Sequence, residues 1–81
     1  MRVLFSERFT RSFQVAPERV QCEFGKQLGY LLRNLRHASL RAKKYDEAQD
    51  IWQARVNDDW RFYFRIEGDL YHLTDIMPHP K

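Results

Sequence analysis

The stretch "IWQARVNDDWRFYFRI", residues 51–66, decides how this chain folds. Apolar and polar side chains alternate on both sides of Asn57-Asp58-Asp59, a pattern typical of two β-strands joined by a hairpin loop. A two-residue turn at Asp58-Asp59 would mix apolar and charged side chains on both faces of the hairpin. We exclude that register because a core on one side of a sheet does not tolerate such a mixture.

A three-residue loop at 57–59 instead pairs apolar residues with one another: Trp52 with Phe64, Ala54 with Phe62, and Val56 with Trp60. The opposite face then carries the polar side chains Gln53, Arg55, Arg61, Tyr63 and Arg65. Arg55 lies directly opposite Arg61, where like charges repel, so a partner or an anionic ligand must offset the cost. The pattern predicts a sheet with one dry face and one basic, partly aromatic face.

The residues before this hairpin predict two amphipathic helices. Ser6 suits the N-cap of a short helix over 6–16, in which Phe9 and Phe13 repeat at i,i+4. Pro17 suits the first turn of a second helix. The apolar stripe of that helix comprises Val20, Phe24, Leu28, Leu31 and Leu35. Gly25 and Gly29 interrupt it at a cost in helix propensity, and we expect them to let the first helix approach closely.

The remaining segments complete the expected fold. A β-prone segment at 2–5 precedes the helices, and "LYHLTDIM" (70–77) follows the turn at Glu67-Gly68-Asp69. The expected order is β-α-α-β-β-β, an α+β fold whose small twisted, mainly antiparallel sheet carries both N-terminal helices on one face. A chain of 81 residues is expected to form a single domain, 1–81, near the lower size limit for independent folding.

Composition excludes some classes of protein and favours others. Cys22 is the only cysteine, so neither an internal disulfide nor a cysteine-based zinc cluster can form. The spacing of His72, Asp75 and His79 matches no standard metal site, and we expect neither a metal nor a cofactor. The N-terminal "MRVLF" is too short for a signal-peptide core, and no stretch reaches membrane-spanning length. We therefore expect a cytoplasmic protein without a membrane partner.

Positive charge is concentrated before the hairpin. Residues 33–44, "RNLRHASLRAKK", contain five Arg or Lys and no acid, with Leu40 as the expected anchor to the core. A solvated surface is one explanation of such a run. The absence of acids favours contact with nucleic acid, whose binding would then weaken steeply with salt.

Three stretches together resemble the RelE/ParE superfamily of toxins from bacterial type II toxin–antitoxin pairs. They are "SLRAKK" (39–44), "IWQARVNDDWRFYFRIEGD" (51–69) and "IMPH" (76–79). Arg55, Arg61 and His79 match the places where the family carries an Arg at a strand end, an Arg after the hairpin loop and a His after the last strand. The resemblance implies a small twisted sheet with two helices on one face. It also implies toxicity, which in most RelE-like members is metal-free cleavage of mRNA on the ribosome.

Such cleavage drives the ribose 2′-OH onto the adjacent phosphorus and needs a base, an acid and fixed cations. Arg61 is the expected stabiliser of the transition state, and Arg55 is expected to bind phosphate. His79 is the expected general acid or base because imidazole titrates near neutrality. Tyr63 is expected to stack on a base or donate a proton. Further RNA or phosphate contacts are expected from Lys43, Lys44, Arg41 and Arg65.

The sequence also allows other interpretations of these residues. The arginines can be solvated strand residues paired with Glu67 or Asp75, and His79 can belong to a frayed tail. Some RelE-like ribonucleases use a glutamate as base, and the sequence does not place Glu47 or Glu67 on the basic face. A ParE-like inhibitor of DNA gyrase and a catalytically inactive toxin-fold binding protein are the alternative functions. In every case the resemblance implies a cognate antitoxin as partner.

Overall fold

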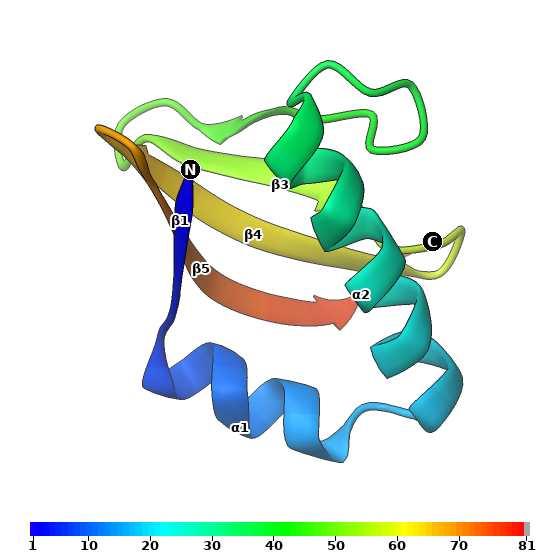
Figure 1. The fold of residues 1–81 in the computed structure, drawn as a ribbon. Coiled ribbons are helices and arrows are strands. Elements are labelled where there is room, and N and C mark those ends of the chain that lie inside the picture. Colours follow the sequence, from blue (N-terminus) through cyan, green and yellow to red (C-terminus); the bar gives the residue numbers. More distant parts are fainter. Residues whose placement is uncertain (81) are drawn as a thin grey trace.

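A computed structural model describes residues 1–80, which form two helices and a five-stranded sheet. The elements are β1 (Arg2–Phe5), α1 (Glu7–Val15), α2 (Glu18–Arg33), β2 (Lys43–Asp46), β3 (Ile51–Arg55), β4 (Trp60–Glu67) and β5 (Leu70–Pro78). The strand order across the sheet is β1-β5-β4-β3-β2, with β1 parallel to β5 and the other pairs antiparallel (Figure 1). This confirms the predicted α+β fold, to which β2 adds one strand that the sequence pattern did not predict.

The β3–β4 hairpin has the predicted register. Trp52 pairs with Phe64, Ala54 with Phe62, and Arg55 with Arg61, while the Val56 N–H donates to the Trp60 carbonyl at 3.0 Å. The side-chain oxygen of Asn57 closes the loop by accepting the backbone N–H groups of Asp59 and Trp60 at 2.8 and 2.9 Å. The loop therefore spans three residues, and the apolar side chains of both strands share one face.

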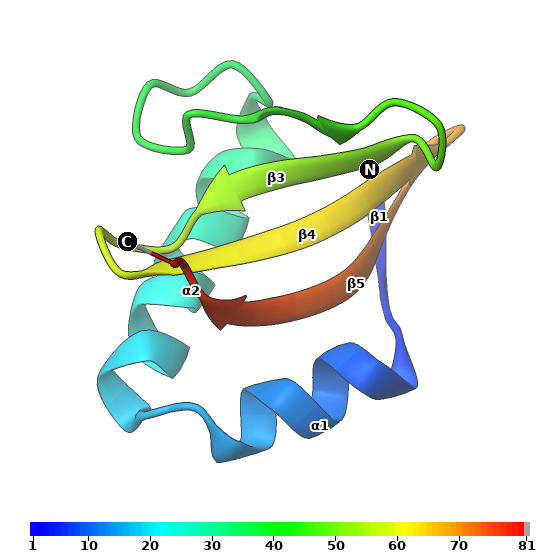
Figure 2. The same cartoon turned by 180° about the vertical axis from the view of Figure 1, so that it is seen from behind.

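The two helices contact this apolar face in different ways. α2 crosses the face, and the Phe24 ring meets Phe62 edge-on at 5.2 Å between centroids (Figure 1). α1 runs beside β5 in both views (Figures 1 and 2). It contributes buried Phe9 to the same core. The predicted cap is present, since the Ser6 hydroxyl accepts the Phe9 N–H at 2.9 Å. No helix within residues 1–80 is long and apolar enough to cross a membrane.

The two glycines of α2 do not have the expected role. Gly25 and Gly29 are exposed, and a Cβ atom added at either would have no neighbour within 4 Å. The prediction that they allow close approach of α1 is therefore wrong. Helical periodicity places both residues on the outer side of α2, away from the stripe that contacts the sheet.

Candidate functional site

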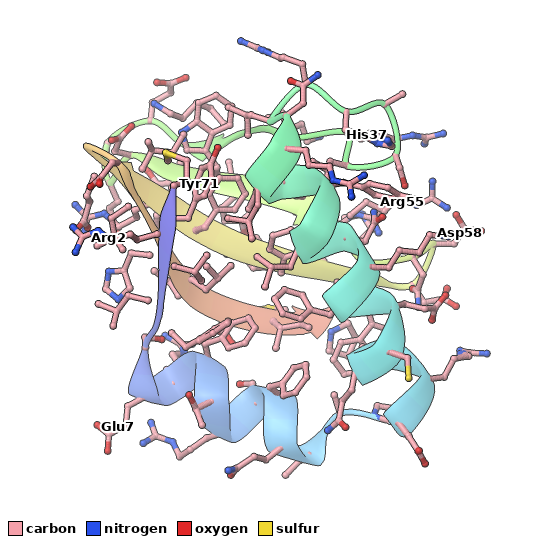
Figure 3. All side chains as sticks on the ribbon, in the orientation of Figure 1. Arg2, Glu7, His37, Arg55, Asp58 and Tyr71 are labelled. Atoms are coloured by element: carbon pink, nitrogen blue, oxygen red, sulfur yellow. The ribbon has the colours of Figure 1, made fainter. Side chains whose placement is uncertain are left out.

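The site lies on the face of the sheet opposite α2, which no helix within residues 1–80 covers (Figure 2). Alternation along the strands turns Arg55 and Arg61 to this open face, where the β3–β4 register sets them opposite each other. Figure 3 shows Arg55 and Asp58 at the hairpin end of the sheet. The predicted basic face is therefore present, and Arg55 and Arg61 lie at one end of it.

A hollow of about 200 Å³ opens between these arginines and the neighbouring segments. We call it the arginine hollow. Its charged or titratable lining residues are Arg41, Lys43, Arg55, Arg61 and His79. These five predicted residues come from the segment before β2, from β2, β3 and β4, and from the end of the chain. Only the tertiary fold brings them together.

Arg61 is held by the hairpin loop and remains able to bind a ligand. Its Nη1 donates to the carbonyls of Asn57 at 2.6 Å and Trp60 at 3.0 Å. These contacts fix the guanidinium group at the mouth of the loop. Arg61 has no ion pair with any residue of the described chain. Because a guanidinium carries five N–H donors, its remaining donors can meet phosphate oxygens.

Arg55 is paired with a loop carboxylate. Its Nη2 lies 2.6 Å from Asp58 Oδ1, and the Asp58 side chain is exposed. An ion pair with an exposed partner contributes little to stability, so an incoming phosphate can compete for Arg55. The partner differs from Glu67 and Asp75, which the sequence suggested. The pairing also reduces the repulsion between the two facing arginines.

His79 is held at the hollow by its backbone. Its N–H donates to the Asp59 carbonyl at 2.7 Å, which ties the end of the chain to the hairpin loop. Its Nδ1 is buried and has no hydrogen-bond partner among residues 1–80. The end of β5 therefore places an imidazole beside Arg61.

The basic segment is attached to β3 through Leu40 and Gln27. The Leu40 side chain is fully buried, as predicted, and its carbonyl accepts the Arg55 N–H at 2.8 Å. Gln27 of α2 is 4% exposed, and its Nε2 donates to the carbonyls of Arg55 at 2.7 Å and Ser39 at 3.2 Å. The Ser39 hydroxyl donates back to Gln27 Oε1 at 3.0 Å. Sequence reasoning missed Gln27, although it interrupts the apolar stripe between Phe24 and Leu31.

Arg41 occupies an uncommon backbone conformation. Its φ of 48° lies in the left-handed region, which is rare for residues other than glycine. This turn leads the chain from buried Leu40 into β2. It also sets Arg41 beside Lys43 at the rim of the arginine hollow.

Lys44 lies on the other face of the sheet from Lys43. Lys43 pairs with Gln53 of the open face, whereas Lys44 pairs with Trp52 and its Nζ lies 5.4 Å from the centroid of that ring. An ion pair and hydrogen bond with Asp50 raises the pKa of Lys44 and lowers the pKa of Asp50. Lys44 is therefore separated from the arginine hollow, because successive side chains of a strand alternate between faces, and its contact with RNA stays a prediction.

Tyr63 faces the open side but is covered. It is 6% exposed, its hydroxyl accepts a hydrogen bond from Gln53 Nε2 at 3.1 Å, and Tyr45 packs edge-on against it at 5.0 Å. Its ring is therefore not free to stack on a base, contrary to expectation. Tyr45, which the sequence did not single out, is 61% exposed beside it.

Four other titratable residues lie away from the arginine hollow: Arg65, Glu47, Glu67 and Tyr71. Arg65 is four residues beyond Arg61, about 13 Å along β4, and its Nε lies 3.9 Å from Glu67. Glu47 lies 3.9 Å from Lys44 Nζ, so neither glutamate lines the hollow. Tyr71 lies in the core with Phe64, and burial raises its pKa (Figure 3). Within residues 1–80, no cluster of three or more His, Cys, Asp or Glu is placed to hold a metal ion.

The whole architecture is similar to solved toxin structures. A YoeB/ParE toxin from Agrobacterium tumefaciens superposes with a TM-score of 0.81 at 13% identity, covering 99% of this chain and 100% of that one. YafQ from Escherichia coli BL21(DE3) superposes with a TM-score of 0.79 at 15% identity, covering 98% of this chain and 94% of that one. A chain of a RelB–RelE antitoxin–toxin complex from Methanococcus jannaschii superposes with a TM-score of 0.74 at 14% identity. The superposition covers 93% of this chain and 88% of that one.

No protein-family profile matches this sequence, and no curated protein matches it. The structural similarity nevertheless spans nearly the full length of both chains in each comparison. The chain therefore has the fold of RelE/ParE superfamily toxins, as its short motifs predicted.

Proposed function

We propose that this chain, which has the fold of RelE/ParE toxins, is a toxin that cleaves mRNA on the ribosome without a metal ion. The arginine hollow carries the proposal, because it combines four cationic side chains with one imidazole. Its size and charge suit a phosphodiester group. The hollow lies on the open face, where an extended strand of RNA can reach it. Figure 2 shows that neither α1 nor α2 covers this face of the sheet.

The proposed reaction is transfer of the phosphoryl group to the neighbouring ribose hydroxyl. The 2′-oxygen forms a bond to phosphorus, the bond from phosphorus to the 5′-oxygen breaks, and a 2′,3′-cyclic phosphate and a 5′-hydroxyl result. Arg61 and Arg55 bind the non-bridging oxygens, whose negative charge grows in the transition state. His79 carries out one of the two proton transfers, since it supplies the only imidazole among the described residues that line the hollow.

We also propose a cognate antitoxin as partner and the cytoplasm as location. The similar RelE chain is bound to its antitoxin in the Methanococcus jannaschii complex, which supports a partner of the same kind here. An acidic segment of such a partner would neutralise the arginine hollow and compete with RNA.

Expression of the chain without an antitoxin should arrest translation, and sequencing of RNA 5′ ends should locate new cuts in translated messages. Arg61→Ala should lower cleavage at least about 100-fold, because it removes a donor to the developing charge. His79→Gln should also lower cleavage by removing the imidazole to which the proposal assigns a proton transfer. Arg11→Ala is a suitable control, since Arg11 is exposed on α1 and pairs with Glu7.

Thermal unfolding of each variant separates loss of chemistry from loss of fold. Arg61→Lys provides a second test, because it keeps the charge but loses the planar pair of donors. Arrested cells with intact mRNA would contradict the proposal. DNA damage with intact mRNA would instead favour inhibition of gyrase.

A further inference from the structure

A second and larger hollow lies on the open face beside the arginine hollow. Its volume is about 390 Å³, and β2, β3, β4, β5 and the start of α1 contribute to it. Side chains with large apolar surfaces form much of its wall: Tyr45, Ile51, Tyr63 and Met77. We call it the tyrosine hollow. Neither the fold comparison nor the proposed chemistry assigns it a role.

The two hollows share a wall. Gln53 lines the arginine hollow and Tyr63 lines the tyrosine hollow, and the hydrogen bond between them spans 3.1 Å. Met77 pairs with Arg61 in the β4–β5 register, so it lies beside the arginine on the same face. Arg61 and Tyr63 are two residues apart, about 7 Å along the strand. A group bound in one hollow is therefore next to a group bound in the other.

The tyrosine hollow has the chemistry of a base-binding site. Tyr45 is 61% exposed and meets Tyr63 edge-on, with an interplanar angle of 69°, which leaves an open aromatic surface. Any nucleobase can stack on such a surface, because every base has an aromatic face. Arg8 lies at the hollow with its Nε 3.1 Å from Asp75 Oδ2. The Arg8 side chain is largely exposed, so its other N–H groups can meet the polar edge of a base.

We propose that the tyrosine hollow binds the nucleobase of the single-stranded nucleotide whose phosphate occupies the arginine hollow. This inference rests on the proposed ribonuclease function and adds a subsite to it. Continuity with the four cations favours RNA over a protein segment as occupant. A base paired within a duplex would not reach Tyr45, so the site requires an unpaired nucleotide.

Titrations of the isotope-labelled full chain, followed by NMR, test the subsite with two probes. Inorganic phosphate should shift the signals of residues that line the arginine hollow, Arg55 and Arg61 among them, and leave the methyl signals of Ile51 and Met77 unchanged. Adenosine 3′-monophosphate should also shift the methyl signals of Ile51 and Met77, and should bind about tenfold more tightly because stacking adds to phosphate binding. Tyr45→Ala should reduce nucleotide affinity to that of phosphate, whereas Tyr45→Phe should retain it.

Leu4→Ala is the matched control, since it removes another exposed apolar side chain from a different part of the surface. If the nucleotide shifts only signals of the arginine hollow and binds no more tightly than phosphate, the subsite is refuted while the arginine hollow stands. If neither probe shifts the arginines, the proposed phosphate site itself fails. If Tyr45→Ala weakens an antitoxin complex but leaves nucleotide affinity unchanged, the hollow is a protein contact and the inference is wrong.

Discussion

The buried amide of Gln27 joins α2 to two segments that bring arginines to the open face. It donates to the Arg55 carbonyl at the end of β3 and to the Ser39 carbonyl just before Arg41. Both carbonyls belong to backbone that a helix or strand ladder does not satisfy, and an unpaired buried carbonyl is costly. One polar residue in an otherwise apolar stripe thus positions part of the arginine hollow.

Gln27→Leu should lower the free energy of unfolding by about 1–3 kcal/mol, because it leaves buried carbonyls without donors. It should also weaken phosphate binding, since Arg55 and the segment carrying Arg41 lose a shared anchor. Denaturant unfolding and phosphate titration measure the two effects.

Gln21→Leu is the matched control for Gln27. Gln21 also lies on α2 and donates to a backbone carbonyl, that of Phe13 at 2.7 Å, away from the arginine hollow. The Gln21→Leu variant should lose stability and keep the phosphate affinity of the unmodified protein. Equal losses of phosphate affinity in both variants would show that Gln27 has no specific positioning role.

At the scale of elements, the side of α2 that faces the sheet is well packed, whereas its solvent-exposed side carries two residues of low helix propensity. Phe24 and Leu31 are buried against the sheet, whereas Gly25 and Gly29 face solvent. Glycine lowers helix stability because the unfolded chain loses more conformational freedom there than at alanine. Packing of the inner side must therefore offset the poor propensity of this helix.

Gly25→Ala and Gly29→Ala should each raise the free energy of unfolding by about 0.5–1 kcal/mol. The added methyl groups meet no neighbour within 4 Å, so strain does not cancel the gain. Gly68→Ala is the control with the opposite sign, because Gly68 has a φ of 63° in the β4–β5 turn. Loss of stability in either helix variant, measured by thermal unfolding, would contradict this account.

At the scale of the whole molecule, positive charge is distributed unevenly over the surface. The chain has a formal net charge of only +3, with fourteen Lys and Arg against eleven Asp and Glu. Several acids pair with cations outside the arginine hollow, as Asp50 does with Lys44 on the helix-covered face and Asp75 with Arg8 at the tyrosine hollow. Positive charge therefore gathers at the arginine hollow, where no carboxylate lines the wall within the described chain.

Binding of a short single-stranded RNA should weaken with salt, with log affinity falling linearly against log salt concentration. Lys43→Ala should make the slope shallower by about 0.7, the share of one phosphate contact. Lys44→Ala should leave the slope unchanged because this lysine lies on the opposite face. Fluorescence anisotropy at stepped salt concentrations measures both slopes, and equal effects would contradict the assignment of faces.

The sequence by itself determined the hairpin register, the N-cap of α1 and the face on which Arg55 and Arg61 lie. These features depend on contacts between neighbours in the chain or across a short loop, which a period of two or of 3.6 residues encodes directly. The prediction for the glycines of α2 is wrong although the same periodicity covers them. A period of 3.6 residues places Gly25 and Gly29 on the outer side of the helix, where α1 does not approach.

Only the tertiary structure decided the composition of the site. Strand β2 exists because Lys43 and Lys44 pair with β3, and this pairing separates the two lysines. His79 reaches Arg61 because its backbone bonds to a loop twenty residues earlier, and the Tyr63 ring is covered because β2 brings Tyr45 against it. Each outcome depends on hydrogen bonds and packing between segments far apart in sequence. No local periodicity encodes such contacts, because their geometry is set only when the strands pair and the helices pack on the sheet.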